Sequence, residues 1–103
     1  VEPDLVVYRR DLRLEEVKGP DLLLAIEVAE TTLAFDRGRK AQLYAAYGVN
    51  ELWVVDAAER TTWVHRGPTA LGWGSVVVVP PTGEVSPEAP GLYPVRVRLA
   101  DWD

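Results

Sequence analysis

The sequence contains no cysteine and no methionine among its 103 residues, and it has a single histidine. Without cysteine the chain can form neither a disulfide framework nor a thiolate metal site. This absence fits a reducing compartment, so we expect a cytoplasmic protein. No apolar run approaches the length of a bilayer span, and the chain does not begin with the pattern of a signal peptide. We therefore expect a soluble protein with no membrane partner.

Positive charge is in the minority, since eleven Lys and Arg residues stand against sixteen Asp and Glu residues, for a net charge of -5. Affinity for nucleic-acid phosphates comes mainly from Lys and Arg, so this balance argues against a protein that binds nucleic acid over its whole surface. Six of the eleven cations, however, lie in two short segments, residues 9–13 and 37–40. A local basic rim around an acidic site therefore remains compatible with the total charge.

The length and composition are those of one ordinary globular domain, with 48% hydrophobic and 26% charged residues. Apolar runs bounded by turn residues predict strands, and helical spacing of apolar residues after the capping candidates at 31–36 predicts one main helix that ends at Gly48. The predicted helix covers 36–47, and the predicted strands cover 4–8, 22–29, 51–56, 61–66, 76–79 and 93–99. The sequence therefore predicts an α/β fold, a mixed β-sheet core with one main packed helix.

Glu27 interrupts the apolar run 22–29, which is typical of a strand covered on both faces. A charge buried without a partner is unfavourable, so Glu27 is expected to have either a bound cation or a structural ion pair with Arg or Lys. Asp4, on the neighbouring strand, can approach Glu27 if the register is right, whereas Asp21 lies about 20 Å away at roughly 3.3 Å per residue. Two carboxylates with no nearby His or Cys suit Mg²⁺ or Mn²⁺ better than zinc.

Several short motifs occur in an order that resembles a known family. They are Pro3-Asp4, Ile26-Glu27-Val28, Asp36-Arg37-Gly38-Arg39-Lys40, Tyr44, Gly48-Val49 and Glu51-Leu52-Trp53-Val54-Val55-Asp56. Together they resemble the bacterial putative restriction endonuclease family, a Uma-type domain of unknown function in the PD-(D/E)xK nuclease superfamily. The resemblance covers residues 3–66, with a weaker echo at 90–92 and 99–102. It implies a restriction-endonuclease-like fold.

The resemblance also implies a chemistry, the hydrolysis of nucleic-acid phosphodiester bonds, with DNA as the favoured substrate. Asp4 and Glu27 would be ligands of a catalytic Mg²⁺ or Mn²⁺, with the backbone carbonyl of Val28 as a further ligand. The cation would activate a water molecule and neutralise charge on the scissile phosphate. Lys40 would be the catalytic lysine, which orients the attacking water or stabilises the transition state.

The sequence departs from the commoner superfamily pattern at Ala29, where a lysine two residues after the glutamate is usual. In the family that it resembles, the lysine comes from the following helix, and Lys40 stands at that place. Arg37 and Arg39 beside it could hold flanking phosphates. Members also usually carry elements before the Pro-Asp motif, so residues 1–103 are expected to form a single nuclease-like domain that lacks its N-terminal elements.

Other interpretations of these residues stay open. The chain could be a nuclease-derived domain that binds nucleic acid or a protein without cutting, or an interaction domain in which Glu27 forms a structural ion pair. Residues 76–79 could form an exposed edge that pairs with a second copy in a homodimer, or an ordinary buried strand. His65 is expected to be an exposed strand residue without a catalytic role, and Trp53 is expected in the core.

Overall fold

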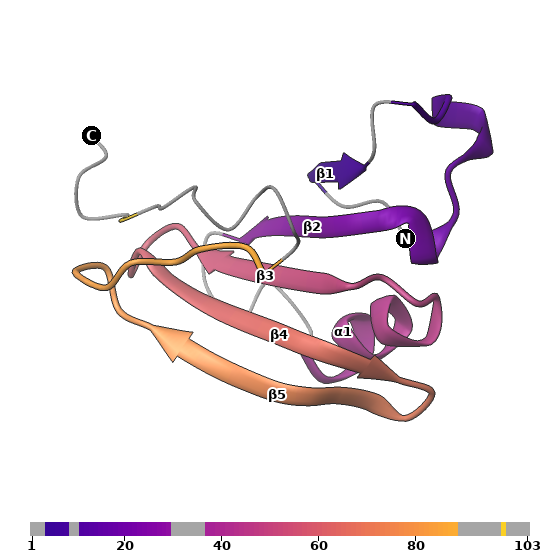
Figure 1. The fold of residues 1–103 in the computed structure, drawn as a ribbon. Coiled ribbons are helices and arrows are strands. Elements are labelled where there is room, and N and C mark those ends of the chain that lie inside the picture. Colours follow the sequence, from indigo (N-terminus) through magenta and orange to yellow (C-terminus); the bar gives the residue numbers. More distant parts are fainter. Residues whose placement is uncertain (1–3, 9–10, 30–36, 89–97, 99–103) are drawn as a thin grey trace.

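Five strands form one mixed sheet, and a helix packs against one of its faces (Figure 1). The computed structural model describes residues 4–8, 11–29, 37–88 and 98, with the backbone alone at 14, 37 and 38. In spatial order the strands are β1 (Leu5–Tyr8), β2 (Leu22–Ala29), β3 (Glu51–Asp56), β4 (Thr61–Thr69) and β5 (Gly72–Val79). The helix is α1 (Arg37–Ala46), and two 3-10 turns, η1 (Leu14–Glu16) and η2 (Gly19–Asp21), precede β2. The predicted α/β class is confirmed.

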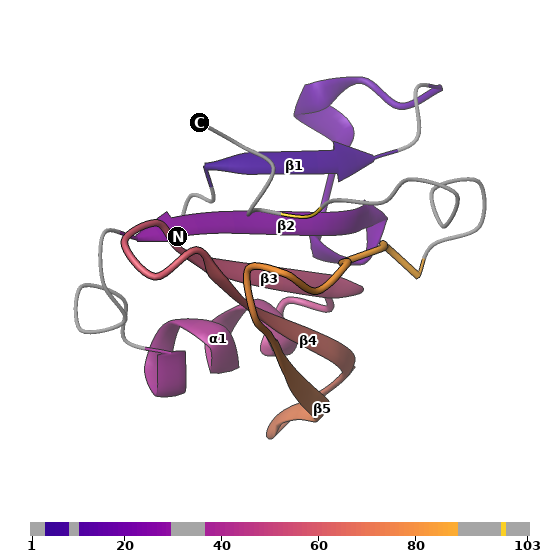
Figure 2. The same cartoon turned by 90° about the vertical axis from the view of Figure 1, so that its left-hand side faces the viewer.

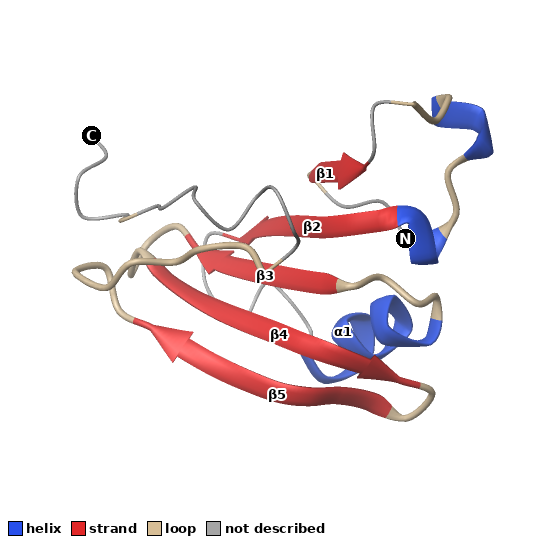
Figure 3. Ribbon diagram, in the orientation of Figure 1, coloured by secondary structure: helices blue, strands red, loops and turns tan. Residues whose placement is uncertain are grey.

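The central pair, β2 and β3, is parallel, whereas β1, β4 and β5 each run antiparallel to their neighbours (Figure 3). Parallel neighbours need a crossover between them, and the chain segment that contains α1 provides it. The strand direction turns steadily from β1 to β5, as the right-handed twist of a sheet requires (Figure 2). The helix α1 packs mainly against β3, β4 and β5, and the Tyr44 hydroxyl reaches from it to Glu27 on β2.

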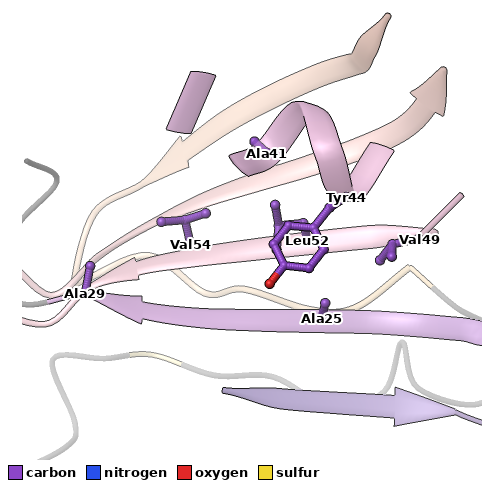
Figure 4. Packing of buried hydrophobic residues seen from close by; sticks show 7 residues of the cluster. All are labelled: Ala25, Ala29, Ala41, Tyr44, Val49, Leu52 and Val54. Carbon is purple, nitrogen blue, oxygen red and sulfur yellow. The ribbon is translucent and has the colours of Figure 1, made fainter. Parts of the chain in front are cut away.

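The two faces of the sheet have separate cores because side chains alternate along each strand. The face under α1 is lined by small and aliphatic residues around one tyrosine: Ala25, Ala29, Ala41, Tyr44, Val49, Leu52 and Val54 (Figure 4). The opposite face buries Leu24, Trp53, Val64 and Val85, so the expectation that Trp53 is a core residue is confirmed. Glu27 has the same parity as Ala25 and Ala29 on β2, which puts its side chain on the α1 face.

The C-terminal end of α1 is fixed by Gly48, whose φ of +83° suits a residue without a side chain. The Val49 N–H donates to the Tyr44 carbonyl at 3.2 Å, and the Tyr47 N–H donates to the Leu43 carbonyl at 3.0 Å. These bonds satisfy carbonyl groups that the last turn would otherwise leave open. The helix therefore ends at Ala46, two residues after Tyr44, and the Tyr44 backbone is held in place.

The boundaries of β2 and β3 agree with the prediction, but the β4–β5 hairpin is longer than predicted. Pairing continues to Pro68 with Trp73 and to Thr69 with Gly72, so β4 runs three residues past Arg66 and β5 begins at Gly72. Residues 76–78 are about half exposed, which corrects the alternative of a buried strand. The predicted capping segment 31–36 and most of the predicted strand 93–99 lie outside the described residues.

The prediction for His65 was wrong, since its exposed fraction is only 3%. Its Nδ1 lies 3.2 Å from the Leu52 carbonyl oxygen, and its ring meets that of Trp73 edge-on at 5.8 Å. Trp73 is itself tied to α1, because its Nε1 donates to the Ala41 carbonyl at 2.7 Å. The cover over His65 comes from β5 and α1, and the alternation of β4 gives no sign of it.

Candidate metal centre

Glu27 lies in the layer between the sheet and α1, with an exposed fraction of 7%. On its own strand it stands between Ala25 and Ala29, and across the parallel pair it faces Val54. The surroundings are therefore apolar on two sides, where an ionised carboxylate needs a specific partner. None of the ion pairs formed by side chains in the described part of the chain involves Glu27.

The partner of Glu27 is Tyr44, whose hydroxyl donates to the Glu27 Oε1 at 2.6 Å. Tyr44 spans the layer from α1 to β2, with its ring in the core and its oxygen directed at the strand (Figure 4). Burial raises the pKa of Tyr44 above its ordinary value, and the hydrogen bond and charge of Glu27 and the charge of Asp4 raise it further. Tyr44 therefore stays protonated and remains a hydrogen-bond donor.

Asp4 joins this pair from the position directly before the neighbouring strand. The antiparallel register of β1 and β2 sets Leu5 opposite Ile26, and extending it by one residue places Asp4 opposite Glu27. Directly opposed residues project on the same face, with Cβ atoms roughly 5 Å apart. The Asp4 Oδ2 accepts the Val28 N–H at 2.7 Å, and its charge acts on Tyr44. Two carboxylates and a phenol thus come together at one end of β1.

The backbone carbonyl of Val28 points toward the same place. Ala29 accepts a hydrogen bond from the Ala57 N–H at 2.7 Å, so the Ala29 carbonyl faces β3. Successive residues of a strand face opposite edges, and the N–H and C=O of one residue share an edge. The Val28 carbonyl therefore faces β1, beside the N–H that donates to Asp4. A third oxygen becomes available next to the two carboxylates.

This donor set is chemically suited to a small hard cation. Within residues 4–8, 11–29 and 37–88 there is no group of three or more His, Cys, Asp or Glu side chains that could hold a metal ion. Two carboxylates and one carbonyl are instead the sparse oxygen set on which Mg²⁺ is commonly bound, with water and substrate oxygens as the remaining ligands. Zinc prefers nitrogen and sulfur ligands, and neither Asp4 nor Glu27 has such a neighbour among the contacts described above.

The predicted cationic residues lie on the first turn of α1. Lys40 is exposed and precedes Tyr44 by four residues, so the two share one stripe of the helix. Arg39 is exposed, and Arg37 is the first residue of α1. The register thus brings Asp4, Glu27 and Val28 together, and the helix adds Lys40 to the same side of the sheet.

Tyr44 is the residue whose place in the site the sequence analysis missed. It was included in the motif pattern, but it was given no role beside Asp4, Glu27 and Lys40. A signal was available, because a buried tyrosine hydroxyl must find a hydrogen-bond partner and Glu27 was the buried acceptor in need of one. The spacing of four residues from Lys40 also placed Tyr44 on the stripe that faces the site.

A mixed sheet with one packed helix is an α/β architecture consistent with restriction-endonuclease-like proteins. The chain belongs to the putative restriction endonuclease family (Uma2), whose sequence model matches residues 1–97. The resemblance drawn from the motifs is confirmed at the level of the family. Comparisons with curated proteins and with solved structures found no match. Among the described residues, no helix has both the length and the apolar character that crossing a bilayer demands.

Proposed function

We propose that this protein is a metal-dependent endonuclease that hydrolyses phosphodiester bonds of nucleic acid, with DNA as the favoured substrate. Family membership supports nuclease activity in general. The observation that carries the finer proposal is the hydrogen bond of 2.7 Å from the Val28 N–H to Asp4, at the step of the register that faces Glu27. Through it, two adjacent strands contribute a carboxylate each at one point.

The electrostatics of Glu27 favour a cation over a structural ion pair. Its partner Tyr44 is neutral, and the charge that acts on the same phenol from the next strand is the negative charge of Asp4. Two carboxylates held close together repel each other, and a bound cation relieves that repulsion. Asp4, Glu27 and the Val28 carbonyl would hold Mg²⁺ or Mn²⁺. When bound, the cation would supply charge neutralisation at the scissile phosphate and activation of the attacking water.

The other residues act on the phosphate and the water. The Lys40 ammonium, on the helix stripe of Tyr44, would orient the attacking water or stabilise the charge that develops on the phosphoryl oxygens. Arg37 and Arg39, at the start of the same helix, would bind flanking phosphates, which makes substrate affinity strongly dependent on salt. No covalent intermediate is required, since water is the nucleophile.

The test combines metal binding with cleavage. We expect calorimetry to detect Mg²⁺ or Mn²⁺ binding that Glu27→Gln abolishes, and we expect cleavage of plasmid DNA that stops when EDTA is added. Lys40→Ala should lower the cleavage rate about 100-fold or more, because it removes a charge that acts in the transition state. The matched control is Lys18→Ala, which changes the only other lysine of the chain, exposed before η2.

The outcomes separate the competing functions. Metal binding without cleavage of DNA or RNA would favour a nuclease-derived domain that binds nucleic acid or a protein. Cleavage that survives both EDTA and Lys40→Ala would contradict the proposal. Circular dichroism of each variant checks that the loss of a signal does not come from unfolding.

A further inference from the structure

We propose that Tyr44 makes the metal centre selective for Mg²⁺ over Ca²⁺ by reserving one oxygen of Glu27. The inference rests on the proposed function, because it takes the metal site as its starting point, and it assigns a specificity role to a residue outside the ligand set. It is carried by the contact between the Tyr44 hydroxyl and the Glu27 Oε1, at 2.6 Å in the buried layer.

The Tyr44 hydroxyl has little freedom to leave that oxygen. The side chain is 2% exposed, and its ring packs among Ala25, Ala41 and Leu52 (Figure 4). Its backbone is held as well, since its carbonyl accepts the Val49 N–H at 3.2 Å. A close-packed ring cannot swing without opening a cavity. The Oε1 of Glu27 therefore already accepts a hydrogen bond from a fixed donor that competes with a cation for its electron pairs, and Oε2 is the oxygen that Tyr44 leaves open.

The second carboxylate is restricted in the same way. The Asp4 Oδ2 accepts the Val28 N–H at 2.7 Å, so Oδ1 is the oxygen that this hydrogen bond leaves open to a cation. Each acidic side chain of the site thus has one oxygen committed to a neutral donor from the protein, one to a phenol and the other to a peptide N–H. This pairing favours binding of a metal through the other oxygen of each carboxylate over binding through both oxygens.

Single-oxygen binding distinguishes the two common alkaline-earth cations. Ca²⁺ takes six to eight oxygen ligands at about 2.3–2.6 Å and often binds a carboxylate through both oxygens. Mg²⁺ requires six ligands in octahedral geometry at about 2.0–2.1 Å and keeps several waters, so one oxygen from each carboxylate suffices. A site whose carboxylates each offer one oxygen therefore favours Mg²⁺, and freeing the Glu27 Oε1 should help Ca²⁺ more.

The experiment is a calorimetric titration of Mg²⁺ and of Ca²⁺ into the protein and into Tyr44→Phe. The variant keeps the ring in the core and removes only the hydroxyl. We expect its Mg²⁺ affinity to fall roughly tenfold, as is usual when a hydrogen bond to a metal ligand is lost. We expect its Ca²⁺ affinity to stay level or rise. The ratio of the two dissociation constants should then shift toward Ca²⁺ by about tenfold or more.

The matched control is Tyr47→Phe, which removes a hydroxyl from a residue that directly follows α1 and is 54% exposed. We expect it to leave both affinities unchanged. A merely structural role of Tyr44 would weaken the two metals in parallel, and that result would overturn the inference while leaving the proposed function standing. Tighter binding of Ca²⁺ than of Mg²⁺ by the unaltered protein would also overturn it, without recourse to a variant. Absence of Mg²⁺ binding by the unaltered protein would overturn the inference and the proposed metal site together.

Discussion

Two glutamates are buried in neighbouring strands of this sheet, and they have different kinds of partners. Glu51, on β3, is 2% exposed and faces away from α1, beside Trp53. Its Oε1 accepts the Glu88 N–H at 2.8 Å, and its Oε2 accepts the Trp53 Nε1–H at 2.6 Å and pairs with the Arg66 guanidinium at 3.2 Å. The negative charge of Glu51 is thus compensated inside the fold.

Glu27, on β2, accepts a hydrogen bond from the neutral hydroxyl of Tyr44. The negative charge of Asp4 acts on Tyr44 together with that of Glu27. The fold supplies Glu51 with a cation, whereas at Glu27 it brings two carboxylates together. A buried carboxylate with a full set of internal donors ties segments of the chain together, here β3 to residues 86–88. A buried carboxylate beside a second carboxylate is instead a candidate ligand for a cation from outside, as proposed for Glu27. Burial alone therefore does not distinguish the two glutamates, whereas the charge of their partners does.

The same substitution at both positions should separate the two roles. Glu51→Gln turns one acceptor oxygen into a donor that faces the N–H of Glu88 or of Trp53, and it removes the charge opposite Arg66. We expect the free energy of unfolding to fall by about 3 kcal/mol. Glu27→Gln keeps an acceptor for Tyr44 and removes one of the two negative charges that act on it, so the change should stay within about 1 kcal/mol. Urea unfolding followed by circular dichroism measures the free energy of unfolding of both variants. Equal losses would contradict the view that Glu51 stabilises the fold more than Glu27 does.

Metal binding should distinguish the two glutamates through a gain in stability that depends on Glu27 and not on Glu51. A ligand at 100 times its dissociation constant stabilises the folded state by about 2.7 kcal/mol. We expect this increment from Mg²⁺ or Mn²⁺ in the unaltered protein and in Glu51→Gln, because the Glu51 cluster lies on the other face of the sheet. Glu27→Gln should show no increment. Thermal unfolding with and without the metal gives the comparison, and a metal response lost in Glu51→Gln but kept in Glu27→Gln would reverse the assignment.

The smallest expected effect is the pH dependence that Tyr44 gives to the metal-free protein. Its pKa in the folded state is raised above the ordinary value of about 10, so the folded protein holds this proton more tightly than the unfolded chain does. The contribution to stability is therefore complete below about pH 10 and is lost as the pH rises further. Urea unfolding at pH 8 to 11 should show a shallower alkaline decline in Tyr44→Phe than in Tyr47→Phe. Identical declines would mean that the buried hydroxyl is not linked to folding.

Much of the fold was predictable because the patterns that specify it are local. The apolar run from Leu22 to Ala29 predicted both ends of β2 correctly, and Gly48 predicted where α1 ends. The pairing of β4 with β5 beyond Arg66 was not predictable from alternation, since Gly and Pro in that stretch argued for a loop. His65 was misjudged because its burial depends on the hairpin partner Trp73 and on α1, which the alternation of β4 does not reveal.

The sequence by itself determined the family, the strands and helix of the described core, and the presence of an acidic residue where an aliphatic one was expected. These follow from spacing within a few residues, which the chain carries in its order. The tertiary structure decided which acidic residues meet. The β1–β2 register, extended by one residue, sets Asp4 opposite Glu27, and the packing of α1 brings the Tyr44 hydroxyl to Glu27. The β3–β4 pairing gives Glu51 its arginine. Partner identity depends on register and packing between distant segments, and that is why two buried glutamates in similar apolar strands have different partners.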